Sequence, residues 1–421
     1  MNHSQLLITP TRSAGLARLN SFLPNAGRHY ESRRNHDLGP GERTNVSMLS
    51  PYISHRLVTE EEVLGAVLAK HSPEAAEKFV HEVFWRTYFK GHLETRPFLW
   101  TNYKAALQAQ ADDLGGKGGL RKSYERAVDG RTGISCFDAW VEELVETGYL
   151  HNHTRMWFAS IWIFTLQLPW QLGADLMYRH LLDGDAASNT LSWRWVGGLH
   201  TKGKTYLARA DNIRTCTAGR FNPQGLAREA PPLEDAAMLP ATKLRAAASG
   251  YPTGRIGLLL SEDDLHPELP DPAVTQIVAV AGGTCTSERS PLPVSALVTS
   301  FAAAALEDGL ANTAARLKVS ATSLPTFSSV CVLDWARAAG VTTIAVPYVP
   351  AGPTADELLQ LKSRLSVAGV TLVEVRRDFD TRAWPYGTRG FFAMKEKIPM
   401  LLGTLEPFAD ERAQQSLFAT P

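Results

Sequence analysis

Cysteine is scarce in this chain of 421 residues, and the spacing of its thiols excludes several kinds of site. No two cysteines form a C-x-x-C pair, whereas zinc centres, iron–sulfur clusters and disulfide frameworks depend on clustered or paired thiols. We therefore expect no metal centre. A few separate thiols are typical of a protein from a reducing cytoplasm, where we expect this one to be located. The four cysteines are Cys136, Cys216, Cys285 and Cys331.

Net charge is absent as well, since 43 basic side chains balance 43 acidic ones. Residues 1–220 are slightly basic, which permits an anionic partner such as DNA without demonstrating one. A long apolar run is also missing. The most apolar stretch, from Met156 to Trp170, contains polar residues and is shorter than the roughly 20 residues that cross a membrane. We expect it to be a core helix, and we expect no leader sequence and no membrane partner.

The length of the chain predicts two domains, because a single core rarely grows beyond about 250–300 residues. In residues 1–224 helical periodicity dominates, and no long alternation of polar and apolar residues predicts a strand. Thr59 and the pair Ser72-Pro73 mark helix starts. Residues 154–168 are apolar nearly all round, which predicts a central helix. The first domain is therefore expected to be all-α.

Composition changes after Pro223, and residues 225–252 mix proline, alanine and charge as linkers do. In residues 253–405 short runs of β-branched and aliphatic residues alternate with helical patterns. This alternation predicts a doubly wound parallel α/β sheet. The expected fold is an α domain followed by an α/β domain, with residues 406–421 as a C-terminal tail.

Polar residues interrupt an otherwise apolar stretch between residues 148 and 195. Burying such groups is costly unless they pair with one another or bind a polar ligand. A fixed pair of Arg155 and Asp183 that frames a heteroaromatic ring would meet this requirement. A structural salt bridge with helix-capping asparagines would meet it equally well, so the residues alone leave both interpretations open. The polar residues are Asn152, Arg155, Asp183, Asp185 and Asn189.

Two sequence elements in this stretch closely resemble the signature of the FAD-binding domain of the DNA photolyase and cryptochrome family. They are GYLHNHTRM from Gly148 and LLDGDAASNTLSWRW from Leu181. Three upstream elements are similar to the same family: RHYESRRN from Arg28, VSMLSPYIS from Val46 and FVHEVFWRTYF from Phe79. The resemblance covers roughly residues 10–200. It implies a helical FAD-binding domain in a light-responsive protein.

The resemblance implies a contact with FAD for each residue of a defined set. Arg155 with Asp183 would brace the flavin ring. Asp185 would engage its pyrimidine edge, and Asn189 would face the reactive N5 atom. The loop at residues 47–50 would hold the phosphates, although ordinary helix capping explains its serines equally well without the family. The implied FAD contacts are Tyr30, Ser47, Met48, Leu49, Ser50, Phe79, Glu82, Arg86, Asn152, Arg155, Asp183, Asp185 and Asn189.

The resemblance is nearest to the photolyases that act on cyclobutane pyrimidine dimers, where a pocket beside the flavin receives the flipped-out dimer. Aromatic faces in such a pocket stack on the bases and polar groups read their edges. Without the family, Glu82 and Arg86 would be favoured as an i,i+4 ion pair on an amphipathic helix. The implied pocket residues are Glu82, Trp85, Asn152, Met156 and Trp195.

Tryptophans suggest a route for electrons. Trp193 and Trp170 match the inner two members of the family's photoreduction chain. The outermost member is expected around residues 115–124, where no tryptophan occurs. Three aromatic residues could complete another route, although core packing is the favoured interpretation of each. They are Tyr124, Trp157 and Trp162. The implied catalytic residues are Glu82, Asn189, Trp193 and Trp170.

The chain departs from the family in its domain order and in two local features. Photolyases begin with an α/β antenna domain, whereas here the α/β half comes last, so we interpret the order as permuted. Whether the α/β half binds a second antenna chromophore stays open. His153 stands where dimer photolyases often have arginine, which puts one substrate contact in doubt. His151 and His153 are poorly spaced for a metal site. A basic segment could track DNA or be a solvated loop; it contains Lys202, Lys204, Arg209, Arg214 and Arg220.

Three hypotheses for function follow from these patterns. The first is an enzyme that repairs pyrimidine dimers in DNA by electron transfer from photoexcited reduced FAD. The second is a cryptochrome-like blue-light photoreceptor without repair activity. The third and least favoured is a flavoprotein with a redox role in the dark. Retention of the pocket residues favours repair.

Overall fold

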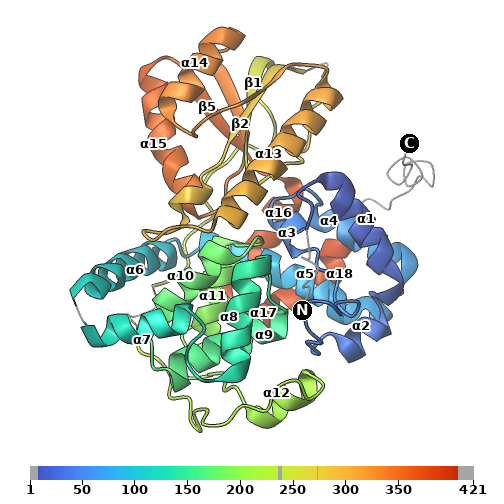
Figure 1. The fold of residues 1–421 in the computed structure, drawn as a ribbon. Helices are drawn as coiled ribbons and strands as arrows, with labels where there is room; N and C mark the ends of the chain where they lie inside the picture. The colour runs from blue at the N-terminus through green and yellow to red at the C-terminus, as the bar shows by residue number, and fades with distance from the viewer. Residues whose placement is uncertain (1–7, 117, 236–238, 273, 406–421) are drawn as a thin grey trace.

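The computed structural model describes residues 8–116, 118–235, 239–272 and 274–405, so the expected tail at 406–421 lies outside the described residues. The chain forms a helical region and an α/β region (Figure 1). The helices of the first region are α1 (Arg12–Phe22), α2 (Arg28–Arg33), α3 (Ser50–Ser54), α4 (Glu60–Lys70), α5 (Pro73–Glu94), α6 (Phe98–Gly116), α7 (Gly118–Val128), α8 (Ser135–Thr147), α9 (Asn152–Ser160), α10 (Trp170–His180), α11 (Ala186–Val196) and α12 (Ala210–Cys216).

Local sequence signals explain several helix ends. Thr59 and Glu62 form a reciprocal capping box at the start of α4, and the Ser72 hydroxyl accepts a hydrogen bond from Ala75 at the start of α5. Gly148 ends α8 in the left-handed conformation with a φ of 65°. The predicted central helix is buried as expected, but it changes from α9 to a π-helical turn over Ile161–Thr165.

The α/β region contains a parallel five-stranded sheet with strand order β3-β2-β1-β4-β5, so the predicted doubly wound arrangement is confirmed. The strands are β1 (Gly254–Ser261), β2 (Thr275–Gly283), β3 (Ala321–Ser323), β4 (Thr343–Pro347) and β5 (Thr371–Val375). The helices are α13 (Ala296–Leu317), α14 (Ser329–Ala339) and α15 (Pro353–Val367). Strand β3 was not predicted, since it has three residues that are all exposed at the sheet edge. Helix α14 was not predicted either, although its 11 residues begin after the capping Ser328 and end before Gly340.

After β5 the chain returns to the helical region. Helices α16 (Asp378–Ala383), α17 (Phe391–Lys395) and α18 (Ile398–Leu402) lie among the first helices of the chain, as Figure 1 shows in red against blue. Gly91 of α5 allows this approach, because a Cβ atom there would lie 2.7 Å from the carbonyl oxygen of Trp384. The segment predicted as the end of the α/β domain therefore packs on α5.

A cluster of buried charges joins the two regions. It contains Arg56, Asp264, Arg377 and Asp380, and we call it the seam. Arg56 lies after α3 and donates to both carboxylate oxygens of Asp380, at 2.8 and 2.6 Å, and to Asp264 at 3.3 Å. Arg377 completes the cluster with hydrogen bonds of 2.7 and 3.1 Å to the two oxygens of Asp264. Each oxygen of Asp264 and Asp380 thus has a cationic partner.

Within the described ranges, no helix combines the length and the apolar character that crossing a bilayer requires.

Candidate functional site

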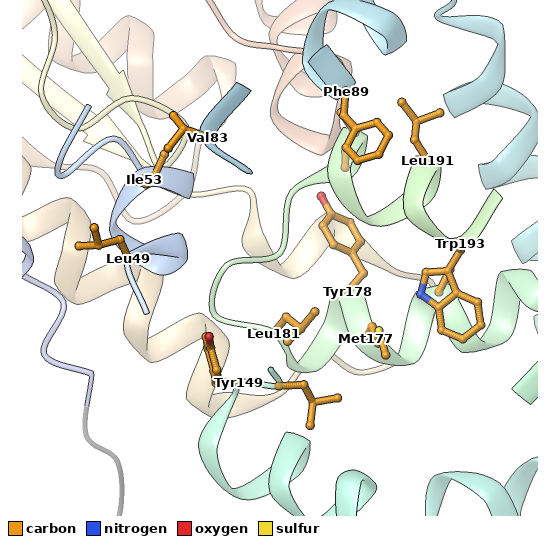
Figure 2. Packing of buried hydrophobic residues seen from close by; sticks show 14 of the residues in the cluster. Leu49, Ile53, Val83, Phe89, Tyr149, Met177, Tyr178, Leu181, Leu191 and Trp193 are labelled. Atoms are coloured by element: carbon orange, nitrogen blue, oxygen red, sulfur yellow. The ribbon is translucent and has the colours of Figure 1, made fainter. Parts of the chain in front are cut away.

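A cavity of about 540 Å³ opens within the helical region. Its walls come from α2, α3, α5, α9, α10 and α11 and from the connection between α8 and α9. Much of the wall is apolar: in the view of Figure 2, Leu49, Ile53 and Val83 lie on one side and Leu181 and Trp193 on the other. A cavity of this size and composition is typical of a small-molecule or cofactor site.

The cavity brings together residues that are far apart in the sequence. All of the predicted FAD contacts and all of the predicted pocket residues line it, and so does Trp193. Trp170 is the exception among the predicted catalytic residues, because it lies outside the cavity wall and is mostly buried. The residues that line the cavity as predicted are Tyr30, Ser47, Met48, Leu49, Ser50, Phe79, Glu82, Trp85, Arg86, Asn152, Arg155, Met156, Asp183, Asp185, Asn189, Trp193 and Trp195.

Arg155 and Asp183 form the predicted ion pair, with Arg155 Nη2 2.9 Å from Asp183 Oδ2. Burial acts to raise the pKa of Asp183, but Arg155 outweighs this effect and holds the pKa below its usual range. The other oxygen, Asp183 Oδ1, is buried without a hydrogen-bond partner among the described residues. A buried acceptor of this kind is costly to leave unpaired, so it marks a position for a ligand donor.

Asp185 has two structural roles beside the cavity. Its carboxylate accepts a hydrogen bond of 2.7 Å from the backbone of Ser188 and so caps α11. It also lies 3.2 Å from Lys90 Nζ and 3.9 Å from Arg86 Nη1. These cations outweigh the effect of burial and hold the pKa of Asp185 well below its usual range. Asp185 is therefore a fixed negative charge in the cavity wall.

Asn189 lies one turn further along α11. Its side-chain nitrogen donates a hydrogen bond of 2.8 Å to the backbone oxygen of Ala174 on α10. This bond fixes the orientation of the amide relative to the cavity that it lines. A fixed neutral amide can hydrogen-bond a ring nitrogen but does not readily supply a proton.

The loop before α3 forms another part of the wall. Met48 has a φ of 54°, in the left-handed region that non-glycine residues seldom adopt. The Ser47 hydroxyl accepts a hydrogen bond of 3.3 Å from the Leu49 backbone, and Arg18 Nε holds the Ser47 carbonyl at 2.7 Å. Sequence reasoning missed Arg18, because nothing in the local pattern of α1 distinguishes it from other surface arginines.

Glu82 pairs with Arg34 and not with Arg86. Arg34 Nη1 lies 2.8 Å from Glu82 Oε1, whereas Arg86 points toward Ser54 and Asp185. The i,i+4 interpretation of the α5 pair is therefore wrong, because Arg86 finds partners across the cavity. Burial raises the pKa of Glu82 although Arg34 opposes the shift.

Trp85 is held between aromatic neighbours. Phe391 of α17 stacks on its ring with centroids 3.8 Å apart and planes 11° apart, and Phe89 lies 5.3 Å away. Sequence reasoning missed Phe391, since this contact joins residues about 300 positions apart and depends on the return of the chain after β5. His153 also lines the cavity, where it contacts the Asn35 carbonyl at 3.0 Å and the Tyr206 hydroxyl at 3.2 Å.

Two rows of neighbouring aromatic rings, here called files, lie in the helical region, and the first of them starts at Trp193. In the first, Trp162 lies 6.3 Å from Trp193, and Tyr124 lies 6.2 Å from Trp162. Trp193 also packs against Gly173 of α10, where a Cβ atom would lie 2.4 Å from its ring.

In the second file, Tyr103 lies 5.6 Å from Trp170, and Trp100 lies 5.5 Å from Tyr103. Trp170 begins α10, the helix on which Trp193 packs. Trp100 and Tyr103 were not predicted, because the family spacing places the outer tryptophan around residues 115–124 and not at the start of α6. The tertiary contact between α6 and α10 brings Trp100 into the file.

The basic segment after α11 stays exposed at several positions. Lys202, Lys204 and Arg214 are exposed, while Arg209 pairs with Asp211 and Arg220 donates to the Asp37 carbonyl.

No cluster of histidine, cysteine and carboxylate side chains suited to a metal ion occurs in the part of the chain that the structure describes. The cavity is therefore the principal candidate site.

The residues of the cavity suit FAD. The apolar wall can pack against a heteroaromatic ring, the unpaired oxygen of Asp183 can accept from a ring N–H, and the amide of Asn189 can bond a ring nitrogen. Phe79 and Tyr30 add aromatic surface, with ring centroids 5.1 Å apart.

Comparisons with known proteins agree with this geometry. Residues 79–228 match the FAD binding domain of DNA photolyase. The chain is similar to the deoxyribodipyrimidine photo-lyase of Thermus thermophilus, with 33% identity over 204 residues that make up 47% of this chain and 45% of that protein. The corresponding protein of Streptomyces griseus is 31% identical over 217 residues, which make up 48% of this chain and 44% of that protein.

A bacterial class III photolyase from Agrobacterium tumefaciens is a similar solved structure, with 25% identity and a TM-score of 0.40 over 49% of this chain and 44% of that one. The chain spans less than half the length of the curated relatives that it matches. The matching domain covers most of the cavity wall, including α5, α9, α10 and α11. Over residues 79–228 the helical region is therefore similar to the FAD-binding domain of DNA photolyase, and the cavity that this segment lines is a candidate site for FAD.

Proposed function

We propose that this protein is a light-dependent photolyase that repairs pyrimidine dimers in DNA. The observation that carries the proposal is the composition of the cavity. One wall holds the candidate flavin contacts Arg155, Asp183 and Asn189, and the same cavity is lined by the candidate dimer contacts. The relatives from Thermus thermophilus and Streptomyces griseus are named deoxyribodipyrimidine photo-lyases, which supports this activity.

FAD bound in the cavity supplies the absorption of light and the transfer of single electrons. The residues of the chain bind and orient the reacting groups. Trp85 and Trp195 offer aromatic surface for bases out of the stack. Burial raises the pKa of Glu82, and its carboxyl group lines the cavity, where it can hydrogen-bond the edge of a base.

DNA is the proposed partner. A dimer reaches such a cavity only when it is flipped out of the duplex, so contacts beside the opening must hold the phosphate backbone. The exposed Lys202, Lys204 and Arg214 are candidates for these contacts. We propose the cytoplasm as the location.

We also propose that the order of the helical and α/β domains is permuted relative to photolyases that begin with the α/β domain.

The space between the carboxyl edge of the sheet and the helical region, beside Tyr178, Cys285 and Thr354, is about 20 Å³. It holds no more than about one water molecule, so we place no second chromophore there.

A cryptochrome-like photoreceptor is the second candidate. One observation favours it: Phe391 stacks on Trp85 and covers one face of a ring that the repair proposal needs for the substrate. In this alternative the aromatic files supply electrons after illumination, and the contacts between α17 and α5 would carry the change to a partner.

A repair assay distinguishes the candidates. FAD-loaded, reduced protein is illuminated with blue light in the presence of an oligonucleotide with one thymine dimer, and restored thymine is measured. Repair is expected in the parent protein and in a Glu146→Ala control, which removes an exposed carboxylate of α8. Glu82→Ala should reduce repair about tenfold or more, as expected for loss of one hydrogen bond of roughly 1.5–3 kcal/mol to a charged or polar edge. Absence of light-dependent repair by folded, FAD-loaded protein would leave the photoreceptor as the better proposal.

Asn189 is tested by the redox state of bound FAD. Asn189→Ala removes the amide that is anchored to Ala174, so we expect a different flavin redox state to accumulate under illumination. Absorption spectra of the parent and the variant at matched FAD content would show this change. Identical spectra would contradict the proposed role.

A further inference from the structure

Trp100 ends the second aromatic file at a contact between the two regions of the molecule. The ring is 4% exposed, and its Nε1–H group donates a hydrogen bond of 3.0 Å to Asp356 Oδ2. Asp356 lies in the first turn of α15, so the acceptor belongs to the α/β region while the donor belongs to α6. Lys104 Nζ lies 2.6 Å from the same carboxylate oxygen and 5.7 Å from the Trp100 ring.

The three rings of this file are close enough for electrons to pass between them. Trp170 and Tyr103 have centroids 5.6 Å apart with planes at 31°, and Tyr103 and Trp100 have centroids 5.5 Å apart with planes at 29°. Asp356 and Lys104 are 38% and 42% exposed, so the buried ring of Trp100 lies beside charged groups that reach solvent. Trp100 is its outer ring.

The hydrogen-bond partners of these rings differ in one respect that matters for oxidation. An indole or phenol ring that has lost an electron is a much stronger acid than the neutral ring. The radical lasts longer when a base accepts its proton. The Tyr103 hydroxyl is buried without a hydrogen-bond partner among the described residues. Tyr103 therefore has no base for its proton, whereas Trp100 has a carboxylate.

The other aromatic file differs, because the described groups at its outer rings include no carboxylate acceptor. Arg179 Nη2 donates to the Tyr124 hydroxyl at 3.1 Å, which leaves a cation beside that phenol. Trp162 donates to the neutral carbonyl oxygen of Pro169 at 2.9 Å. A carboxylate is far more basic than a carbonyl oxygen, so the geometry distinguishes Trp100 from Tyr124 and Trp162 as a place for a lasting radical.

We propose that Trp100 is the terminal electron donor of the photoreduction path and that Asp356 is the positioning residue that accepts its indole proton. This inference rests on the proposed light-dependent function. Trp100 gives up one electron, which passes through Tyr103, Trp170 and Trp193 to the photoexcited flavin, the one-electron acceptor. The Nε1–H bond of Trp100 breaks, and the proton forms an O–H bond with Asp356 Oδ2.

The products of this step are a neutral tryptophanyl radical and a neutral carboxylic acid, and the return of the electron and the proton reverses it. The neutral acid no longer forms an ion pair with Lys104. Light thereby weakens a contact between α6 and α15, which couples the redox state of the helical region to the position of the α/β region.

The test compares Asp356→Asn with the parent protein after a flash of blue light, with FAD-loaded full-length protein in its oxidised form. Transient absorption distinguishes the cationic from the neutral tryptophanyl radical. The parent protein should form the neutral radical, and this step should slow in D2O. In Asp356→Asn the radical should stay cationic, and its kinetics should show no effect of D2O. It should decay about tenfold faster, which corresponds to a change of roughly 1.4 kcal/mol in the barrier for electron return.

Three further variants make the outcome specific. Asp356→Glu should restore the neutral radical, and Asp334→Asn, which removes an exposed carboxylate of α14, should behave as the parent. Trp100→Phe should produce no neutral tryptophanyl radical. In the dark, the NMR signal of the Trp100 indole N–H should exchange faster with solvent in Asp356→Asn than in the parent, because its acceptor has lost its charge.

The results separate this inference from the proposed function. If light reduces the flavin in the parent but not in Trp193→Phe, the electron path is present. Formation of a neutral radical at the parent rate in Asp356→Asn would then overturn the role of Asp356 alone. If light reduces no flavin in the parent, both the electron path and the role of Asp356 are refuted.

Discussion

The seam between the two regions and the cavity in the helical region both contain buried arginine–carboxylate pairs. They differ in how many of the carboxylate oxygens have a hydrogen-bond partner. In the seam, Arg56 and Arg377 occupy every oxygen of Asp264 and Asp380. In the cavity, Arg155 occupies one oxygen of Asp183 and leaves the other unpaired among the described residues.

This difference indicates different roles. A buried carboxylate whose hydrogen-bonding capacity is filled by the protein holds two segments in register and has nothing left to offer a ligand. A buried carboxylate with an open oxygen is less favourable in the free protein and gains a partner on binding. The seam therefore joins the regions, and the cavity is prepared for a polar cofactor.

The largest effect is expected from Arg56→Met, which removes the cation shared by three buried carboxylates, those of Glu60, Asp264 and Asp380. Breaking a buried ion pair from one side typically costs about 3–5 kcal/mol. The free energy of unfolding, measured with urea, should fall by this amount. Arg209→Met removes an exposed arginine and should change it by less than about 0.5 kcal/mol. A loss below about 1 kcal/mol in Arg56→Met would show that the seam is not a closed structural network.

Asp183→Asn should act mainly on the cofactor. Loss of the charged acceptor should weaken FAD binding by about 1.5–3 kcal/mol, or roughly tenfold to a hundredfold. The stability of the flavin-free protein should change by less, because Arg155 is 24% exposed and is solvated when its partner is lost. Titration with FAD and urea unfolding measure the two effects separately. Asp129→Asn, at an exposed pair, is the matched control. Equal losses of stability in Asp183→Asn and Arg56→Met would remove the distinction between seam and cavity.

The effect of pH depends on His55, which joins the regions beside the charged seam. Its ring nitrogens contact the Glu262 carbonyl at 2.7 Å and the Leu182 carbonyl at 3.2 Å. Burial, with a smaller contribution from Arg289, lowers the pKa of His55 to about 4. The unfolded chain therefore takes up a proton first as the pH falls below about 6.5, and this histidine then favours unfolding.

Its contribution should reduce the free energy of unfolding by about 1.4 kcal/mol for each pH unit between about 6.5 and 4, and should be absent above that range. His55→Gln keeps a donor and an acceptor without a titrating group, so unfolding between pH 7 and 5 should depend less on pH than in the parent. His29→Gln, at an exposed position, should leave the pH dependence unchanged. An unchanged slope in His55→Gln would contradict the neutral, buried state.

Much of the fold could be predicted because its signals are local. Capping at Thr59 and Ser72, the apolar central helix and the short aliphatic strands depend on residues close together in the sequence. The exposed edge strand β3 and the π-helical turn over Ile161–Thr165 could not be predicted, since neither has a distinctive periodicity. The wrong pairing of Glu82 with Arg86 shows that spacing on a helix does not decide which partner a side chain finds.

By itself the sequence determined the residue types of the cavity and, through their resemblance to a family, the cofactor. Tertiary structure decided which buried polar groups have a hydrogen-bond partner within the protein and which do not. Contacts such as Phe391 on Trp85 and Asp356 on Trp100 join positions hundreds of residues apart, so no local pattern encodes them. The open oxygen of Asp183 was also decided at this level, because hydrogen-bond satisfaction depends on every group that folding brings within reach.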